Sequence, residues 1–344
     1  MSALTTARGY GDPVNSVRWG IIGVGNVTEA KSGPGFQQAQ GSQLVAVMRR
    51  DGAKAADYAR RHGVPRWYDD ADALIHDDEV DAVYIATPPD SHRDYAVRVL
   101  AAGKPVYVEK PMARTTAECE EMLAAADRAG LPLFVAYYRR TMPRFVTVKQ
   151  LLDDGAIGQV QAVSVRNSQP AVIEDGADAP WRVRPEISGG GHFVDLASHT
   201  LDLLDHLLGP VARVSGYATR FAGPTAAEDT VSATFQHESG VLGSGLWSYH
   251  TAEERDEVRI LGTTGSLEFS SFGQEPIRLT TATGERQIEA PYPATVQLPL
   301  IQSVVDELTG RGRCPSTGES AIRTARVVDT LLAEYRDTHG LRLP

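Results

Sequence analysis

The stretch VRWGIIGVGNVT, residues 17–28, decides the fold of this chain. It begins as a short apolar run, which is typical of a buried strand. Gly23 then allows a tight turn, and Gly25 allows the backbone to approach a pyrophosphate at the N-terminus of the next helix. Thr28 replaces the third glycine of the usual GxGxxG fingerprint, so we expect looser helix–strand packing there. A glycine turn that binds no ligand can have the same sequence, but the position directly after the first strand favours a dinucleotide site.

The first half of the chain alternates short apolar runs with stretches of helical periodicity. Runs that are apolar throughout indicate strands covered on both faces, and strand–helix alternation then gives a parallel, doubly wound sheet. The predicted strands are 17–24, 44–48, 80–86, 105–108 and 133–136, and the predicted helices are 53–61, 91–102 and 116–129.

The pattern changes near residue 140. Strand-like segments with polar alternation or turn signals follow, which is typical of an open, mainly antiparallel sheet. These segments are 160–167, 213–220, 230–236, 241–249, 257–261 and 265–269. We also expect a long helix at about 191–208 and a terminal helix at 321–336.

A length of 344 residues favours two domains. The expected organisation is α/β, with a loose arm at 1–16, a dinucleotide-binding Rossmann domain at 17–138 and a substrate-binding and oligomerisation domain at 139–344. No apolar run approaches the about 20 residues that a membrane span needs. The first 16 residues lack the apolar core of a signal peptide.

Charge and cysteine content argue against several classes of protein. The net charge of −10 disfavours nucleic acid and anionic membranes as partners, because both attract clustered Lys and Arg. The two cysteines, Cys119 and Cys314, do not have the spacing of metal ligands, and two cysteines in a chain of this length do not indicate a disulfide framework. There is no HExxH motif and no close set of carboxylates, so we expect no metal. These features predict a cytoplasmic protein.

The residues after the second predicted strand bear on the choice of dinucleotide. An acidic residue there binds the ribose 2′-hydroxyl of NAD, whereas an arginine accommodates the 2′-phosphate of NADP. Here the strand is followed by Arg49, Arg50 and Asp51. Guanidinium groups carry a fixed charge and a fork geometry suited to phosphate. The sequence therefore favours NADP(H), with NAD(H) bound through Asp51 as the alternative.

Three further motifs stand at strand ends or ahead of the long helix: ATPPDSH at 86–92, EKP at 109–111 and GGGHFVDLASHTLD at 189–202. Together with the glycine turn they resemble the Gfo/Idh/MocA family of glucose–fructose oxidoreductases and inositol dehydrogenases. The resemblance covers nearly the whole chain, residues 17–336. The stretch NVTEAKSGPGF at 26–36 also resembles a branch that includes anhydrofructose reductase-like proteins.

The resemblance implies a fold, a reaction and a set of catalytic residues. The fold is a Rossmann domain followed by an α/β domain with a large open sheet, whose face often forms dimers or tetramers. The reaction is the oxidation of a secondary alcohol, or the reduction of a ketone, on a sugar, polyol or related small molecule. Lys110 matches the catalytic lysine of the family's EKP motif, and Asp195 and His199 match its Asp and His. The resemblance also implies that Arg182 contacts cofactor or substrate.

Hydride transfer needs a group that exchanges the hydroxyl proton and a group that stabilises the developing alkoxide. We expect His199 to be the acid/base, because imidazole titrates near neutral pH. Asp195 lies four residues earlier, which on a helix places both side chains on one face. It would orient His199 or bind a substrate hydroxyl, although an ordinary exposed pair has the same spacing. Lys110, at the end of a parallel strand, would bind the reacting oxygen.

The residues expected to line the cofactor crevice each have a structural alternative. Glu109 would contact the nicotinamide ribose or shape its turn, and His92 would contact the cofactor or begin a helix. The segment 137–140 would line the pocket, act as a hinge or form ion pairs. The full cofactor set is Gly23, Gly25, Asn26, Val27, Arg49, Arg50, Thr87, Pro88, Pro89, His92, Glu109 and Lys110. The substrate set is Lys110, Arg182, Asp195 and His199.

The sequence thus predicts an NADP(H)-linked sugar or polyol oxidoreductase that forms a homodimer or homotetramer through its open sheet. The alternative enzyme is an NAD-dependent inositol-type dehydrogenase. A protein of a different class, a non-catalytic NADP(H)-binding regulator, has no need of Lys110, Asp195 and His199 together. Their joint presence favours an enzyme.

Overall fold

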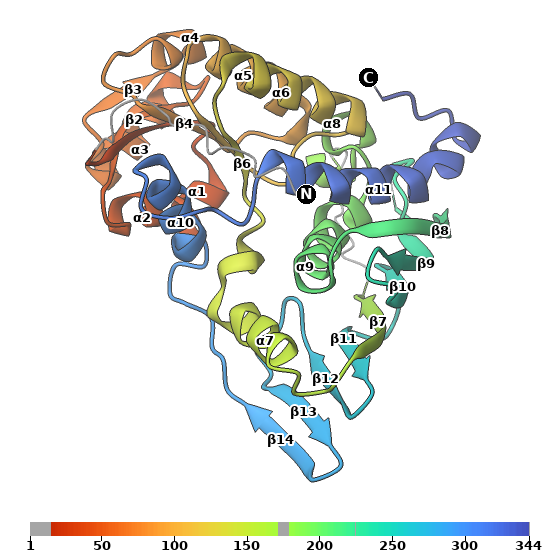
Figure 1. Cartoon of the computed structure of the whole chain (residues 1–344). Coiled ribbons are helices and arrows are strands. Elements are labelled where there is room, and N and C mark those ends of the chain that lie inside the picture. The colour runs from red at the N-terminus through yellow and green to blue at the C-terminus, as the bar shows by residue number, and fades with distance from the viewer. Residues whose placement is uncertain (1–14, 171–178, 224, 344) are drawn as a thin grey trace.

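Two β-sheets, one in each half of the chain, organise the computed structural model (Figure 1). The structure describes residues 15–170, 179–223 and 225–343. The expected N-terminal arm falls almost wholly on residues 1–14, which lie outside the described residues.

The N-terminal sheet has six parallel strands in the order β3-β2-β1-β4-β5-β6. This is the doubly wound order of a Rossmann domain, so the predicted fold class is confirmed. The strands are β1 (Val17–Ile22), β2 (Ser42–Met48), β3 (Arg66–Tyr68), β4 (Ala82–Ile85), β5 (Val106–Val108) and β6 (Leu133–Val135). The helices are α1 (Asn26–Ala30), α2 (Gly33–Gln38), α3 (Gly52–His62), α4 (Ala71–Ile75), α5 (His92–Ala101) and α6 (Thr116–Ala129). The sequence analysis missed β3, α2 and α4, which are too short to show a period.

Helices cover both faces of this sheet, which explains its continuously apolar strands. Along β4, Val83 and Ile85 pack in the core beneath α4, α5 and α6. Ala82 and Tyr84 point the opposite way, into the core beneath α2 and α3. Alternate residues of a strand face opposite sides, so both sets must be apolar when both sides are covered.

The second sheet has eight strands in the order β14-β13-β12-β11-β7-β10-β9-β8. All neighbours are antiparallel except β7 and β10, so the sheet is mixed and mainly antiparallel, as predicted. The strands are β7 (Val160–Ser168), β8 (Val211–Thr219), β9 (Thr230–His237), β10 (Leu242–Ser248), β11 (Arg255–Gly262), β12 (Gly265–Phe269), β13 (Ile277–Thr281) and β14 (Gly284–Ile288). The hairpin β13–β14 was not predicted.

Helices cover only one face of the second sheet. Against that face pack α7 (Pro143–Asp153), α9 (Ser198–Leu208) and α11 (Gly318–Thr338). Val258 and Ile260 of β11 point into this core, whereas Leu261 points away and is 41% exposed. The short α8 (Pro185–Ser188) lies ahead of α9.

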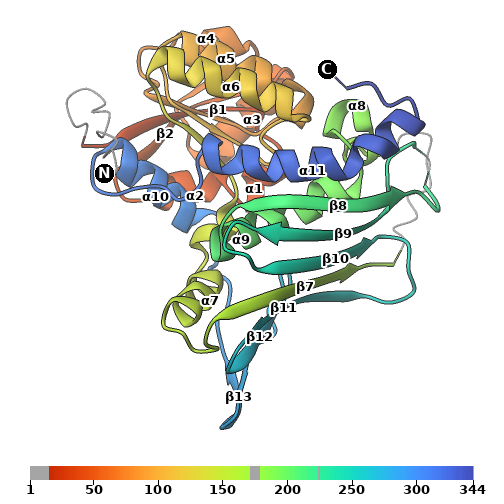
Figure 2. The same ribbon diagram turned by 45° about the vertical axis from the view of Figure 1, so that its right-hand side comes forward.

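The C-terminal segment returns to the Rossmann half (Figures 1 and 2). In α10 (Leu298–Leu308), Leu300 and Ile301 are buried in the same core as β1. In both views α11 runs between α6 and β8, and it contacts both of them. The division at residues 138 and 139 stays a prediction, but α10 and part of α11 contribute to the core on the Rossmann side of it.

The helix expected at 191–208 is not a uniform α-helix. It begins at His192, passes through a π-helical turn at Phe193–Ala197 and continues as α9. A π-turn accommodates one more residue per hydrogen-bonded turn than an α-turn.

Candidate active site

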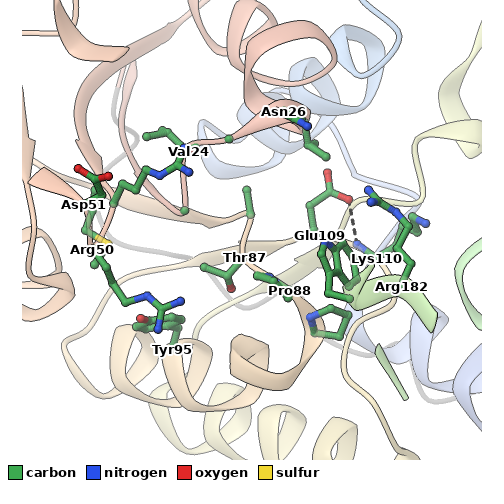
Figure 3. Close-up of a pocket in the computed structure, with 18 of the residues that line it drawn as sticks. Val24, Asn26, Arg50, Asp51, Thr87, Pro88, Tyr95, Glu109, Lys110 and Arg182 are labelled. Atoms are coloured by element: carbon green, nitrogen blue, oxygen red, sulfur yellow. Dashed lines mark hydrogen bonds between the residues drawn. The ribbon is translucent and has the colours of Figure 1, made fainter. Parts of the chain in front are cut away.

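A cavity of about 560 Å³ lies at the carboxyl edge of the Rossmann sheet, where β1, β2, β4 and β5 end (Figure 3). Ligands of doubly wound sheets bind at this edge. The wall is formed by most of the residues expected from the sequence: Gly23, Gly25, Asn26, Val27, Arg49, Arg50, Thr87, Pro88, Pro89, Glu109, Lys110, Arg182 and Asp195. His92 and His199 are the two expected residues that do not line it.

The glycine turn leaves space beside the cavity. Gly23 has a φ of +96°, and a Cβ there would lie 2.9 Å from the Thr87 nitrogen. A Cβ on Gly25 would meet nothing within 4 Å, so its backbone faces open space. Thr28 is fully buried; its Oγ1 accepts a hydrogen bond from the Gly25 nitrogen and donates one to the Gly25 oxygen. The predicted looser packing at Thr28 is wrong, because the threonine closes the helix start with these two bonds.

The arginine pair lies at one end of the cavity, together with Asp51 (Figure 3). Arg49 Nη1 donates to the Val24 carbonyl at 2.9 Å and so holds the glycine turn. Asp51 caps α3, where its carboxylate accepts a bond from the Lys54 nitrogen at 3.2 Å. Backbone hydrogen bonding from Lys54 lowers the pKa of Asp51. Both the basic and the acidic candidates for the ribose thus stand at this end.

His92 is a buried link between two turns. One ring nitrogen lies 2.7 Å from the Thr87 oxygen and the other 3.0 Å from the Pro111 oxygen. The residue is the first of α5 and is fully buried. Of the two alternatives, the geometry therefore matches the helix-start role, and the imidazole is not available to a cofactor.

Glu109 is held by partners that the sequence analysis did not identify. Its Oε1 accepts a hydrogen bond from Tyr84 Oη at 2.5 Å and one from Gln297 Nε2 at 2.7 Å. Its Oε2 accepts one from the Lys110 nitrogen at 3.1 Å (Figure 3). Gln297 stands 188 positions along the chain, just before α10, so no local signal could have pointed to it.

Lys110 and Asp195 meet at the other end of the cavity, 85 positions apart in sequence. Lys110 Nζ lies 2.5 Å from Asp195 Oδ1 and 2.8 Å from the Asp195 main-chain oxygen. Arg182 Nε approaches the second carboxylate oxygen at 3.3 Å. Burial acts to raise the pKa of Asp195, but the charge and hydrogen bond of Lys110 outweigh it, so the pKa lies below its ordinary value.

His199 lies outside this cluster. Its ring is 4% exposed and sits among the rings of Tyr137, Tyr138 and Phe272. Burial, followed by the charges of Arg139 and Lys110, holds the pKa of His199 well below 6.5. The expected Asp195–His199 contact is not formed among the described residues. Asp195 binds the cations of Lys110 and Arg182 instead, whereas the His199 ring packs among aromatic rings.

A buried carboxyl supports the start of the helix that carries Asp195. Glu228 Oε1 accepts a hydrogen bond from the Gly191 nitrogen at 2.7 Å. The two chains pass so closely that a Cβ on Gly191 would lie 2.2 Å from the Glu228 oxygen, which explains the last glycine of the GGG run. Burial raises the pKa of Glu228 to about 7. Nothing in the sequence marked Glu228, because its partner is 37 positions away.

The segment 137–140 divides into two roles. Arg140 forms a buried ion pair with Asp202, in which Nη2 lies 2.7 Å from Oδ1, and it also contacts Asp205 at 3.0 Å. Arg139 is equally buried, but among the described residues it forms no ion pair and donates to the Ser271 oxygen at 2.8 Å.

In the described part of the chain, no group of three His, Cys, Asp or Glu side chains is arranged to hold a metal ion. Within the same residues, none of the helices has the length and apolar character that crossing a membrane requires.

Comparison with known proteins identifies the family. Residues 17–137 match the family described as "Oxidoreductase family, NAD-binding Rossmann fold", and residues 145–268 match the GFO/IDH/MocA C-terminal domain. The chain therefore belongs to the Gfo/Idh/MocA oxidoreductase family.

Three similar proteins extend over nearly the whole chain. Oxidoreductase P35 of Formosa agariphila is 37% identical over 318 residues, 91% of this chain and 97% of that protein. The 1,5-anhydro-D-fructose reductase of Ensifer adhaerens is 28% identical over 311 residues, 89% and 92% of the two chains. A solved structure of the WlbA dehydrogenase from Bordetella pertussis, in complex with NADH and UDP-GlcNAcA, is 26% identical and has a TM-score of 0.81. It covers 94% of this chain and 96% of that one.

The prediction of an enzyme, and not of a non-catalytic regulator, is thereby confirmed. The chain is a nicotinamide-dependent dehydrogenase or reductase that acts on CH–OH groups, with an NAD-binding Rossmann domain.

Proposed function

We propose that this enzyme transfers a hydride between NADP(H) and a secondary alcohol or ketone of a sugar or polyol. The observation that carries the proposal is that one cavity joins two charged clusters. Arg49 and Arg50 stand at one end, and Lys110 with Asp195 stands at the other. A dinucleotide laid along the sheet edge would have its phosphorylated ribose near the first cluster and its nicotinamide near the second. The 1,5-anhydro-D-fructose reductase among the relatives supports a sugar-type substrate.

The residues of the cavity fit such a cofactor. The backbone at Gly25 faces open space in which a pyrophosphate can lie. Thr87, Pro88 and Pro89 supply a rigid wall between the two clusters. When bound, the nicotinamide would supply or accept the hydride.

Lys110 is the proposed contact to the reacting oxygen. Asp195 holds two N–H bonds of its ammonium group through a carboxylate and a main-chain oxygen, which leaves one N–H for the substrate. That donor would stabilise the negative charge that develops on the reacting oxygen. It would stay hydrogen-bonded to this oxygen both when the alcohol is oxidised to the carbonyl and when the carbonyl is reduced. Asp195 is thus the proposed orienting group for Lys110, and Arg182 extends the donor set toward the substrate.

His199 remains the proposed acid/base partner. Its pKa, held well below 6.5 by burial, keeps the ring neutral at physiological pH, and only the neutral form can accept a proton. The charge of Lys110 contributes to this lowered pKa, but the ring itself does not line the cavity. Its role therefore requires the substrate to reach past Lys110 toward the aromatic cluster around His199.

NADPH and NADH titration of the purified protein, followed by turnover of a panel of keto-sugars, aldoses and inositols, tests the proposal. We expect an about tenfold lower Kd for NADPH, which corresponds to about 1.4 kcal/mol, and turnover of a sugar. Preference for NADH with inositol turnover would support the second candidate, an NAD-dependent inositol-type dehydrogenase. That candidate is favoured by Asp51, which lines the same end of the cavity, and by the NADH in the solved relative.

We further propose a homodimer or homotetramer formed through the uncovered face of the second sheet. That face carries exposed apolar side chains on β8, β10 and β11, namely Tyr217, Leu242, Leu246 and Leu261. We also propose a cytoplasmic location, because Cys119 and Cys314 are both buried free thiols.

A further inference from the structure

Glu109 is a buried carboxyl group in the wall of the cofactor cavity. It follows β5 directly and is 7% exposed. In Figure 3 it stands next to Lys110, at the end of the cavity where the nicotinamide is proposed to lie. A ligand in the cavity can therefore come close to this group, so its charge bears on what binds there.

Neutral groups hold the Glu109 side chain in place. Tyr84 Oη and Gln297 Nε2 donate hydrogen bonds to Oε1 at 2.5 and 2.7 Å, and the Lys110 main-chain nitrogen donates to Oε2 at 3.1 Å. Tyr107 Oη in turn donates to Gln297 Oε1 at 3.2 Å. Within the described residues, no cationic side chain forms an ion pair with Glu109. Its charge is therefore hydrogen-bonded but not neutralised.

The other charged groups at this end of the cavity do not supply the missing cation. The Lys110 ammonium group is bound by Asp195. The Arg182 side chain is 42% exposed, so water screens its charge. Burial lowers the pKa of His92, which leaves that ring neutral at physiological pH. Among the described buried groups at this end, one cation thus faces two anions.

The dinucleotide that fits the cavity differs in charge between its two redox forms. The nicotinamide ring carries one positive charge when it is oxidised and none when it is reduced. An anion close to the ring, in a partly buried site of low dielectric, stabilises the charged form over the neutral one. The effect is largest when the anion is already held in position, as three donors hold Glu109.

We propose that Glu109 is the counterion of the oxidised nicotinamide ring, and that Tyr84 and Gln297 are positioning residues that hold it there. The inference rests on the proposed function for the place of the nicotinamide, but not on the choice between NADP and NAD. Glu109 then makes the bound reduced cofactor a stronger hydride donor. As a ketone is reduced, its carbon receives the hydride, its oxygen receives a proton from water through the acid groups of the site, and positive charge appears on the ring.

Separate calorimetric titrations with NADP⁺ and NADPH, and with NAD⁺ and NADH, test the inference without turnover. Glu109→Gln keeps the size of the side chain and removes its charge. We expect it to raise the ratio of the Kd for the oxidised form to the Kd for the reduced form by about tenfold, or about 1.4 kcal/mol. The Kd for the reduced form should stay within about threefold. Glu121→Gln, exposed on α6, removes the same charge outside the cavity and is the control.

A second variant tests the positioning role and leaves the carboxylate in place. Tyr84→Phe removes one donor to Glu109, so we expect the same Kd ratio to rise by about threefold. Tyr58→Phe is the matched control, because Tyr58 is also buried but donates to the Thr28 oxygen. In the double variant with Glu109→Gln, Tyr84→Phe should change the ratio no further, because the charge that it positions is gone.

The possible outcomes separate this inference from the proposed function. An equal rise of both Kd values in Glu109→Gln would overturn the inference, because it would indicate a contact to the ribose, which is the same in both forms. Unchanged Kd values would overturn it as well. If Glu109→Gln does not fold, an unchanged ratio in Tyr84→Phe contradicts the inference. A wild type that binds neither dinucleotide would contradict the proposed function itself.

Discussion

The two ends of the cavity are built in different ways. At the cofactor end, the residues belong to turns that directly follow β1, β2 and β4, and a bond such as Thr28–Gly25 spans three positions. At the catalytic end, Lys110 contacts Asp195, which lies 85 positions further along the chain. Glu228, just before β9, supports the start of the helix that carries Asp195. The first end is specified by local turn chemistry, whereas the second depends on how the two halves of the chain pack. Disturbing them should therefore have different kinetic consequences.

The largest effect is expected at the catalytic end. Lys110→Met should lower kcat by about 10³-fold, in the range of a lost proton-transfer or alkoxide-stabilising group. The Kd for NADPH should stay within about threefold of wild type, because the glycine turn is untouched. Steady-state kinetics and NADPH titration measure the two quantities. Lys149→Met, on the surface of α7, is the control, and near-normal turnover in Lys110→Met would remove the lysine from the mechanism.

A second effect concerns the support of the catalytic end. Below pH 4.5 the Glu228 carboxyl is protonated in both folded and unfolded chains. Between pH 4.5 and about 7 the unfolded chain loses its proton first, so the folded state loses stability, and above about 7 the loss is constant. Glu228→Gln keeps an oxygen for the Gly191 nitrogen but does not titrate.

Denaturant unfolding should therefore show Glu228→Gln gaining on the wild type by about 3 kcal/mol between pH 4.5 and pH 8, because the pKa of Glu228 is raised from 4.5 to about 7 and each pKa unit is worth about 1.4 kcal/mol. Arg336 donates to the Gly189 oxygen beside this site. A stability difference that is flat across this pH range would show that the carboxyl is ionised at no cost.

A smaller effect is expected at the cofactor end. Arg50→Ser should raise KM for NADPH by about tenfold and leave KM for NADH within about twofold, because a lost phosphate contact is worth about 1–2 kcal/mol. The value of kcat should change little. Arg49→Asp should move the preference further toward NAD(H), but it also removes the bond to Val24 that holds the glycine turn. An unchanged ratio of the two KM values in both variants would refute the NADP(H) proposal.

The smallest kinetic effect belongs to the outer face of the second sheet. Leu246→Glu places a charge in the exposed apolar face and should shift the protein toward monomers in analytical ultracentrifugation. kcat should stay within about twofold of wild type, because the cavity lies in the other half. Gln150→Glu, on the exposed side of α7, is the matched control for the added charge, because α7 covers the opposite face of the sheet. A wild type that sediments as a monomer would exclude this interface.

The same contrast explains what the sequence could predict. All Rossmann strands except β3, α6 with its bounds and the residues of the glycine turn were predictable, because periodicity and turn chemistry act over a few positions. The partners of Glu109 and Asp195 were not, because Gln297 and Lys110 reach them only through tertiary packing. The Asp195–His199 pair failed for the same reason: four-residue spacing indicates a shared helix face, but it does not show that Lys110 binds Asp195 or that aromatic rings enclose His199.

The placement of α11 has a consequence for how the protein is made. Ala321 and Ile322 fill the core beneath α5 and α6, Val327 and Val328 fill the core of the second sheet, and Thr317 bridges to Phe134 in β6. During synthesis the Rossmann half emerges from the ribosome before α11, yet its apolar surface is completed only when α11 packs against it. A chain that ends before Gly318 would thus expose apolar side chains of both cores. Cellular quality control would recognise this exposed surface and degrade the chain.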